Sequence, residues 1–144
     1  MLKRSITLFL AIALYTVSFA QKADAIIGRW LSPNGEDQIQ IYKKGNKYFG
    51  KLSWIKYPND ETGQSKTDKK NPDPNLRSRQ ELGLELLKDF TFGGDNVYED
   101  GTIYDPKSGK TYSCKMTIDG EKLKIRGYIG ISLLGRSETW TRVK

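Results

Sequence analysis

The residue types that most often carry out catalysis are sparse in this chain. The sequence contains no histidine and a single cysteine, Cys114. Without histidine there is no Ser-His or Cys-His nucleophile pair, and the common imidazole ligands of zinc and haem iron are missing. Cys114 alternates with Tyr112 and Met116, which predicts a buried, inert thiol on a strand. We therefore expect no catalytic residue and no cofactor.

Paired carboxylates are the remaining route to catalysis, as in glycoside hydrolysis. The adjacent acidic pairs are Glu36-Asp37, Asp60-Glu61 and Glu99-Asp100, and all three lie beside expected turns. Neighbouring residues on a strand point to opposite faces, so neither member of a pair readily assists the other. We interpret these side chains as solvated turn charges, which leaves a carboxylate-based hydrolase as the third functional hypothesis.

Residues 57–80 form a long polar segment that contains three of the five prolines. Asp68, Asn71 and Asp73 offer hard oxygen ligands for Ca²⁺, although their spacing is not that of an EF-hand. The structural alternative, which we favour, is that these residues form turns and that Arg77 and Arg79 pair with the carboxylates. If the two arginines are not consumed in this way, their spacing suits the head of an anionic ligand.

The elements that must position these groups are short segments in which apolar and polar residues alternate, separated by turn residues. This pattern predicts an all-β domain. Gly45-Asn46 predicts a type II′ hairpin turn and Asp119-Gly120 a type I′ turn. Gly93-Gly94 is expected to end a strand, and a Gly-punctuated connection covers residues 129–135. The expected strands cover residues 27–31, 38–43, 47–56, 84–92, 97–104, 110–118, 121–128 and 136–143. Eight such strands suit a closed antiparallel up-and-down barrel, with a two-sheet β-sandwich as the runner-up.

Strand alternation also predicts which side chains face the barrel interior. The expected inward residues are Trp30, Ile39, Ile41, Tyr48, Leu52, Trp54, Tyr112, Met116, Ile118, Leu123 and Ile125. Arg126 and Tyr128 should face solvent unless Gly127 forms a bulge, which we suspect because it would turn Arg126 towards the mouth. The candidate ligand-binding residues are Tyr48, Trp54, Arg77, Arg79, Tyr104, Tyr112, Arg126, Tyr128 and Arg136.

The first twenty residues have the layout of a cleavable signal peptide. Lys3 and Arg4 precede fourteen mainly apolar residues, 6–19, and Ser18-Phe19-Ala20 provides small residues for cleavage before Gln21. A membrane anchor would need about 18 apolar residues or more. We expect an exported protein, periplasmic or secreted, with one domain at residues 21–144 and no transmembrane span after cleavage.

The basic excess does not by itself indicate a partner. The net charge of +7 includes Lys3 and Arg4, and the remaining basic residues are scattered among carboxylates. This distribution is typical of a solvated surface rather than of a nucleic-acid site. An anionic envelope polymer remains a candidate partner.

Four motifs resemble the bacterial family known as domain of unknown function 2147, whose members are small exported proteins. The match extends over residues 26–143, with Gln80 standing where the family usually has proline. The motifs are Gly28-Arg29-Trp30-Leu31; Asp68-Lys69-Lys70-Asn71-Pro72-Asp73-Pro74 with Leu76-Arg77-Ser78-Arg79; Gly101-Thr102-Ile103-Tyr104-Asp105-Pro106 with Gly109-Lys110-Thr111-Tyr112; and Arg126-Gly127-Tyr128-Ile129-Gly130 with Leu134-Gly135-Arg136 and Thr139-Trp140-Thr141-Arg142.

Gly28-x-Trp30 on the first strand and Arg142 on the last also resemble the fingerprint of the calycins, which are lipocalin-like barrels. The resemblance implies that Trp30 plugs one end of the barrel and that the Arg142 guanidinium stacks on it. Gly28, Trp30, Trp140 and Arg142 are therefore the expected barrel-closure residues.

These observations lead to two main hypotheses. The first is an exported binding module that holds a small apolar or amphipathic molecule inside the barrel. The second is an envelope interaction or structural module with a filled core, acting through its basic outer surface.

Overall fold

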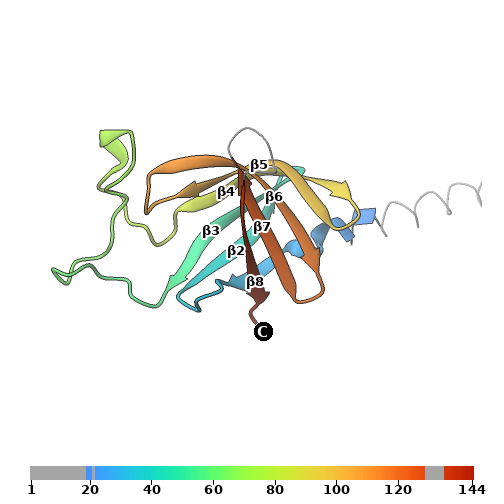
Figure 1. The fold of residues 1–144 in the computed structure, drawn as a ribbon, viewed down its shortest axis with the longest axis horizontal. Helices are drawn as coiled ribbons and strands as arrows, with labels where there is room; N and C mark the ends of the chain where they lie inside the picture. The colour runs from blue at the N-terminus through green and yellow to red at the C-terminus, as the bar shows by residue number, and fades with distance from the viewer. Residues whose placement is uncertain (1–18, 21, 129–134) are drawn as a thin grey trace, which may run out of the picture.

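The chain forms one closed β-barrel. The computed structural model describes residues 19, 20, 22–128 and 135–144. Each strand pairs antiparallel with the next along the chain, and β8 pairs with β1 to close the sheet (Figure 1). The strands are β1 (Gly28–Leu31), β2 (Asp37–Lys44), β3 (Lys47–Ile55), β4 (Glu85–Gly94), β5 (Val97–Asp105), β6 (Lys110–Asp119), β7 (Lys122–Tyr128) and β8 (Arg136–Arg142). The predicted eight-stranded barrel is confirmed, including the strand expected at 84–92.

Two of the sequence predictions fall wholly or mainly outside the described residues. They are the signal peptide, of which only Phe19 and Ala20 are described, and the connection at 129–135, of which only Gly135 is described. Within the described ranges, no helix is both long enough and apolar enough to cross a membrane.

The interior follows the predicted alternation with one exception. Apart from Trp54 and Tyr112, every expected inward residue is buried, and Tyr112 is half-buried. Trp54 is 40% exposed, so its predicted inward position is wrong. The reason is a bulge in β3: Gln38 pairs with Trp54 while Ile39 pairs with Leu52, so Ser53 is an extra residue that moves Trp54 to the outer face.

The hairpin turns are tight, but two differ from the sequence prediction. Gly45 has φ +65° and Asn46 does not have positive φ, as a type II′ turn requires. At the β6–β7 turn Asp119 still pairs with Lys122, so the central residues are Gly120 and Glu121 and the predicted type I′ placement is wrong. Strand β4 continues through the two glycines that were expected to end it, and the turn that follows is Asp95-Asn96, where both φ angles are positive.

One end of the barrel is closed by the chain that precedes β1. The short 3-10 helix η1 (Asp24–Ile26) lies at this end (Figure 1). Its Asp24 carboxylate accepts a hydrogen bond of 2.6 Å from Tyr48, and the Tyr98 hydroxyl donates to the Ala23 carbonyl oxygen at 2.5 Å. Burial and the neighbouring Asp24 carboxylate raise the pKa of Tyr48, which therefore remains a neutral donor.

Trp30 and Arg142 secure the closed end as the calycin resemblance implied. Trp30 is fully buried, and its indole nitrogen donates to the Ile26 carbonyl oxygen at 2.9 Å. The Arg142 guanidinium lies 4.2 Å from the centroid of the Trp30 ring and donates to the carbonyl oxygens of Ala25 and Ile27. Gly28 adopts φ +142°, and a Cβ atom there would lie only 2.9 Å from Arg142 Nη1, so the close approach requires glycine.

Candidate functional site

The opposite end of the barrel contains a cavity of about 420 Å³. The long loop between β3 and β4 lies at this end, far from η1 (Figure 1). Among the described residues, the apolar and aromatic lining consists of Ile39, Leu52, Leu86, Ile103, Tyr104, Pro106, Tyr112, Ile125, Tyr128 and Trp140, with Gly127 and Gly135. The charged lining consists of Asp37, Glu81, Asp105, Lys107, Arg136 and Glu138.

Strand direction arranges this lining from the mouth inwards. Strand β2 runs from the open end towards the closed end, so Asp37 lies nearer the mouth than Ile39 on the same inward face. On β8, Arg136 and Glu138 likewise precede the buried Trp140. The cavity is therefore charged at its mouth and apolar further in.

Two carboxylates at the mouth are partly removed from water. Burial raises the pKa of Asp37 above its ordinary value, with Lys107 acting in the opposite direction. Burial also raises the pKa of Glu81, which Lys66 partly offsets. No described residue forms a hydrogen bond or ion pair with either carboxylate. Both groups therefore retain charge that the described part of the protein does not neutralise by direct contact.

The other acidic groups of the cavity are occupied. Glu138 accepts from Arg136 at 2.9 Å and from the Trp140 indole nitrogen at 3.3 Å. Asp105 accepts from the Lys107 backbone nitrogen and the Ser108 hydroxyl within its own turn. These two carboxylates shape the wall, whereas Asp37 and Glu81 are available to a bound molecule.

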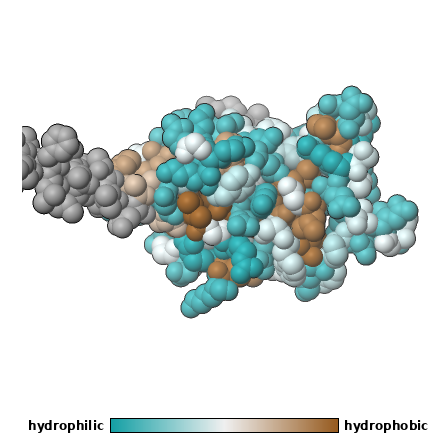
Figure 2. Space-filling model, turned by 180° about the vertical axis from the view of Figure 1, so that it is seen from behind, coloured by the Kyte–Doolittle hydropathy of each residue, from teal (hydrophilic) through white to brown (hydrophobic). Residues whose placement is uncertain are grey.

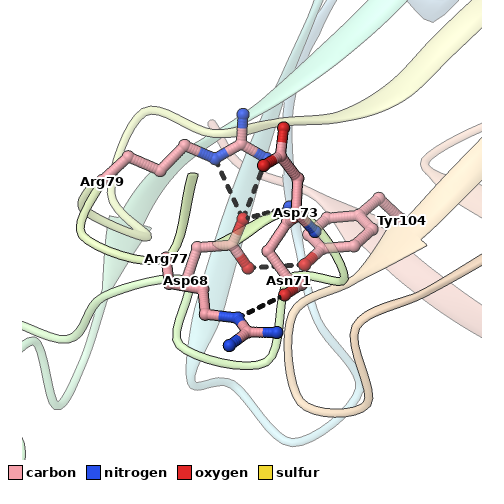
Figure 3. A network of polar contacts seen from close by, with 6 residues as sticks. All are labelled: Asp68, Asn71, Asp73, Arg77, Arg79 and Tyr104. Carbon is pink, nitrogen blue, oxygen red and sulfur yellow. Dashed lines mark hydrogen bonds and ion pairs between the residues drawn. The ribbon is translucent and has the colours of Figure 1, made fainter. Parts of the chain in front are cut away.

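The loop beside the cavity is held by Asp68, whose side chain is fully buried (Figure 3). Its carboxylate accepts hydrogen bonds from Asn71 at 2.8 Å, from Arg79 at 2.9 Å and from the Tyr104 hydroxyl at 2.5 Å. Tyr104 belongs to β5 and lines the cavity, so this network connects the loop directly to the cavity wall. Burial and the Asp68 carboxylate together raise the pKa of Tyr104 to about 12, which keeps its hydroxyl a donor.

This network agrees with only part of the structural interpretation of the loop. Arg79 pairs with Asp68 as the structural interpretation predicted. Arg77 does not pair with a carboxylate but donates from Nε to the Asn71 carbonyl oxygen at 2.7 Å (Figure 3). Asp73 accepts from the Asn75 backbone nitrogen and caps the short helix η2 (Pro74–Leu76). Because a cation would compete with the Arg79 guanidinium for Asp68, the Ca²⁺ interpretation loses its central ligand.

The structure brings only part of the predicted ligand-binding set together. Tyr104, Tyr112, Tyr128 and Arg136 line the cavity. Tyr48 lies at the closed end and Trp54 on the outer face, while Arg79 borders a separate hollow of about 240 Å³ beneath the loop.

The suspected bulge at Gly127 is absent, because β6 and β7 pair in unbroken register from Ser113 to Asp119. Arg126 therefore keeps its outward parity, and it donates to the Ser137 hydroxyl at 3.0 Å on the barrel exterior. Tyr128 shares that parity but lines the cavity at the end of β7, so its predicted solvent-facing position is wrong even without a bulge.

All four carboxylates of the described cavity lining were missed by sequence reasoning, and Asp105 was expected only as a turn residue. Asp37 was interpreted as a turn charge, but β2 begins one residue earlier than predicted and places it on the Ile39 face. The alternation of Glu138 with Trp140 was a usable signal for its inward position. Glu81 gave no local signal, since its place depends on the loop turning back so that its backbone nitrogen bonds to the Lys66 carbonyl oxygen.

Comparisons with known proteins agree with this architecture. A solved structure described as protein HP1028 from the human pathogen Helicobacter pylori, belonging to the lipocalin family, superposes with a TM-score of 0.70. It is 24% identical, and the match covers 83% of each chain. No curated protein matches the sequence.

The family comparison covers most of the barrel. A model described as "Uncharacterized protein conserved in bacteria (DUF2147)" matches residues 28–142, from the first residue of β1 to the last residue of β8. This match spans nearly all of the sequence that carries the family motifs, and the chain belongs to the DUF2147 family.

Proposed function

We propose that this protein is an exported, non-catalytic binding protein that holds one small apolar or amphipathic molecule in the open end of its barrel. The observation that carries the proposal is the cavity of about 420 Å³, which is within the range of small-molecule sites. A barrel of eight strands encloses just enough space for its own side chains or for one small ligand. Here one end is filled by Trp30 and the other retains a cavity.

The arrangement of the two ends supports binding rather than a purely structural role. The closed end concentrates the contacts that stabilise the barrel, and they are separate from the cavity. The envelope-module hypothesis predicted a filled core, whereas the described residues at the open end line a cavity. On the outer surface, Figure 2 shows a mainly hydrophilic face with separate hydrophobic patches.

The experiment is a titration of the mature protein with N-phenyl-1-naphthylamine, an apolar probe that fluoresces when it leaves water. We expect saturable binding at micromolar concentration, because burial of two aromatic rings supplies several kcal/mol (about 25 cal/mol per Å²). Ile125 lies in the wall and is 4% exposed, so Ile125→Trp should fill the cavity and weaken binding at least tenfold. Thr139→Trp adds the same ring to an exposed position of β8 and should bind as the wild type does.

Circular dichroism of both variants checks that the barrel is intact, and Ile103→Phe provides a second, smaller filling of the same cavity. Absence of saturable binding by the wild type, or equal binding by well-folded Ile125→Trp, would refute the proposal. Recovery of bound natural ligand by native mass spectrometry would extend it.

The inward carboxylates keep the hydrolase as a second candidate. Asp37 and Glu81 line one cavity, the Asp37 charge contributes to the raised pKa of Glu81, and a raised pKa is what a general acid requires. The two functions differ in one readout. A binding protein returns its ligand unchanged after long incubation, whereas a hydrolase accumulates product at a rate that falls in Asp37→Asn.

A further inference from the structure

The cavity combines an apolar interior with an acidic mouth, although the protein as a whole is basic. The described lining contains four carboxylates and two cationic side chains, in a chain whose net charge is +7. Since carboxylates are costly to bury without a partner, this excess requires a physical reason. The same feature also suggests what the cavity is built to receive.

The uncompensated charge is located at Asp37 and Glu81. Within the described ranges neither carboxylate has a direct partner, whereas Glu138 and Asp105 are both hydrogen-bonded. Lys107 and Lys66 are close enough to influence the two groups, yet neither forms an ion pair with them. A cation that entered the mouth would therefore meet two available carboxylates.

The geometry below the mouth fits the remainder of such a molecule. Ile39, Leu52 and Ile125 are buried side chains that line the interior, and they offer no hydrogen-bonding groups. The rings of Tyr104, Tyr112 and Trp140 lie in the same wall. Aromatic faces attract cations as well as apolar groups, so they suit a charged nitrogen attached to a hydrocarbon.

From this arrangement we infer that the ligand is a cationic amphiphile: an amine or ammonium head that pairs with Asp37 and Glu81, on an apolar body that fills the interior. The inference rests on the proposed binding function and specifies its ligand class.

The affinity of the cavity for a cationic ligand should depend on pH in a defined direction. Protonation of the carboxylates removes their charge, so the affinity for a cation falls as the pH is lowered. Because the pKa values of Asp37 and Glu81 lie above the ordinary 3.8 and 4.5, the loss begins at a higher pH than for exposed carboxylates. The charged groups that face this pair are Glu36, Lys66, Asp68, Lys107 and Glu138, and the cations among them limit the shift.

The test is isothermal titration calorimetry of the mature protein with three ten-carbon probes, each kept below its micelle concentration. Decylammonium should bind about tenfold more tightly than decan-1-ol, and decyl sulfate should bind most weakly. Asp37→Asn and Glu81→Gln should each weaken decylammonium binding about three- to tenfold, and they should weaken decan-1-ol binding much less. Glu61→Gln removes an equal charge from an exposed loop position and should change none of the three affinities.

The possible results separate this inference from the function on which it rests. Equal binding of decylammonium and decan-1-ol, unaffected by Asp37→Asn, would overturn the cationic head while leaving a binding protein for apolar molecules. Decyl glucoside, titrated as a fourth and uncharged probe, gives a further check: if it binds more tightly than decylammonium, the inference is overturned, since the carboxylates would then accept hydrogen bonds from hydroxyl groups. If no ten-carbon probe binds and the naphthylamine probe fails as well, the binding function itself is wrong.

Discussion

Arg142 contacts three kinds of group at the closed end of the barrel: an aromatic ring, backbone carbonyl oxygens and a carboxylate. Its guanidinium packs against the Trp30 ring, donates to two backbone carbonyl oxygens in the segment before β1, and lies 3.6 Å from the Glu121 carboxylate. The planar guanidinium makes such combined stacking and forked donation possible, whereas lysine does not. One residue of the last strand thus joins Trp30, the segment that precedes β1 and Glu121.

Replacing Arg142 with alanine should lower the free energy of unfolding by about 2–3 kcal/mol, because two charge-assisted hydrogen bonds and the ring contact are lost together. Urea denaturation followed by tryptophan fluorescence measures the change. Arg136→Ala is the matched control, since that side chain is 86% exposed and its pairing with Glu138 should contribute less than about 1 kcal/mol. Equal losses in the two variants would contradict this role of Arg142.

Turns and bulges, rather than strands, account for the differences between sequence and structure at the scale of single elements. The β4–β5 hairpin turns at Asp95-Asn96, with φ angles of +50° and +61°. Positive φ at both central residues matches a type I′ turn, which suits the twist of antiparallel strands. Asparagine tolerates this conformation better than branched residues do.

Asn96→Val should therefore destabilise the barrel by about 1–2 kcal/mol, the cost of placing a β-branched residue at positive φ. The control is Asn46→Val in the β2–β3 turn, where the asparagine does not have positive φ and the cost should be smaller. Thermal denaturation of the two variants gives the comparison. A larger loss at Asn46 would show that turn conformation is not the deciding factor.

Alternation of apolar residues was sufficient to predict the barrel, because the side-chain period of two survives wherever a strand is regular. It failed at Trp54, where one extra residue in β3 reverses the alternation, since a bulge leaves no reliable mark in the sequence. Four of the nine predicted ligand-binding residues line the cavity. Glu81 escaped prediction because its position depends on a contact between two parts of a long loop.

At the scale of the whole molecule, the two ends of the barrel differ in their contribution to stability. The closed end is densely hydrogen-bonded, whereas the open end contains carboxylates whose burial favours the protonated form. A carboxyl group with a higher pKa in the folded state binds more protons there than in the unfolded state. The contribution of these groups to the free energy of unfolding therefore decreases as the pH rises from the pKa of the unfolded state through the higher pKa of the folded state. Above that range the contribution stays lower.

The double variant Asp37→Asn, Glu81→Gln should accordingly be more stable than the wild type at pH 7, with a Tm higher by about 2 °C. The difference should disappear below pH 3.8, the ordinary pKa of Asp, where both carboxyl groups are protonated in both states. Differential scanning calorimetry between pH 3 and 8 measures it, with Glu61→Gln as the control. A double variant that is less stable at pH 7 would mean that the carboxylates have stabilising partners in solution.

Arg142 and the Ile27 carbonyl oxygen meet across a separation of 115 positions in the chain. In a polypeptide emerging from the ribosome, β1 can pair with β2 early, but its other edge has no partner until β8 has been made. During that interval β1 and the newest strand both present unpaired edges that invite association with other chains. The contact that closes the barrel also ends its vulnerability to aggregation, and loss of the final strand would leave a sheet with two open edges.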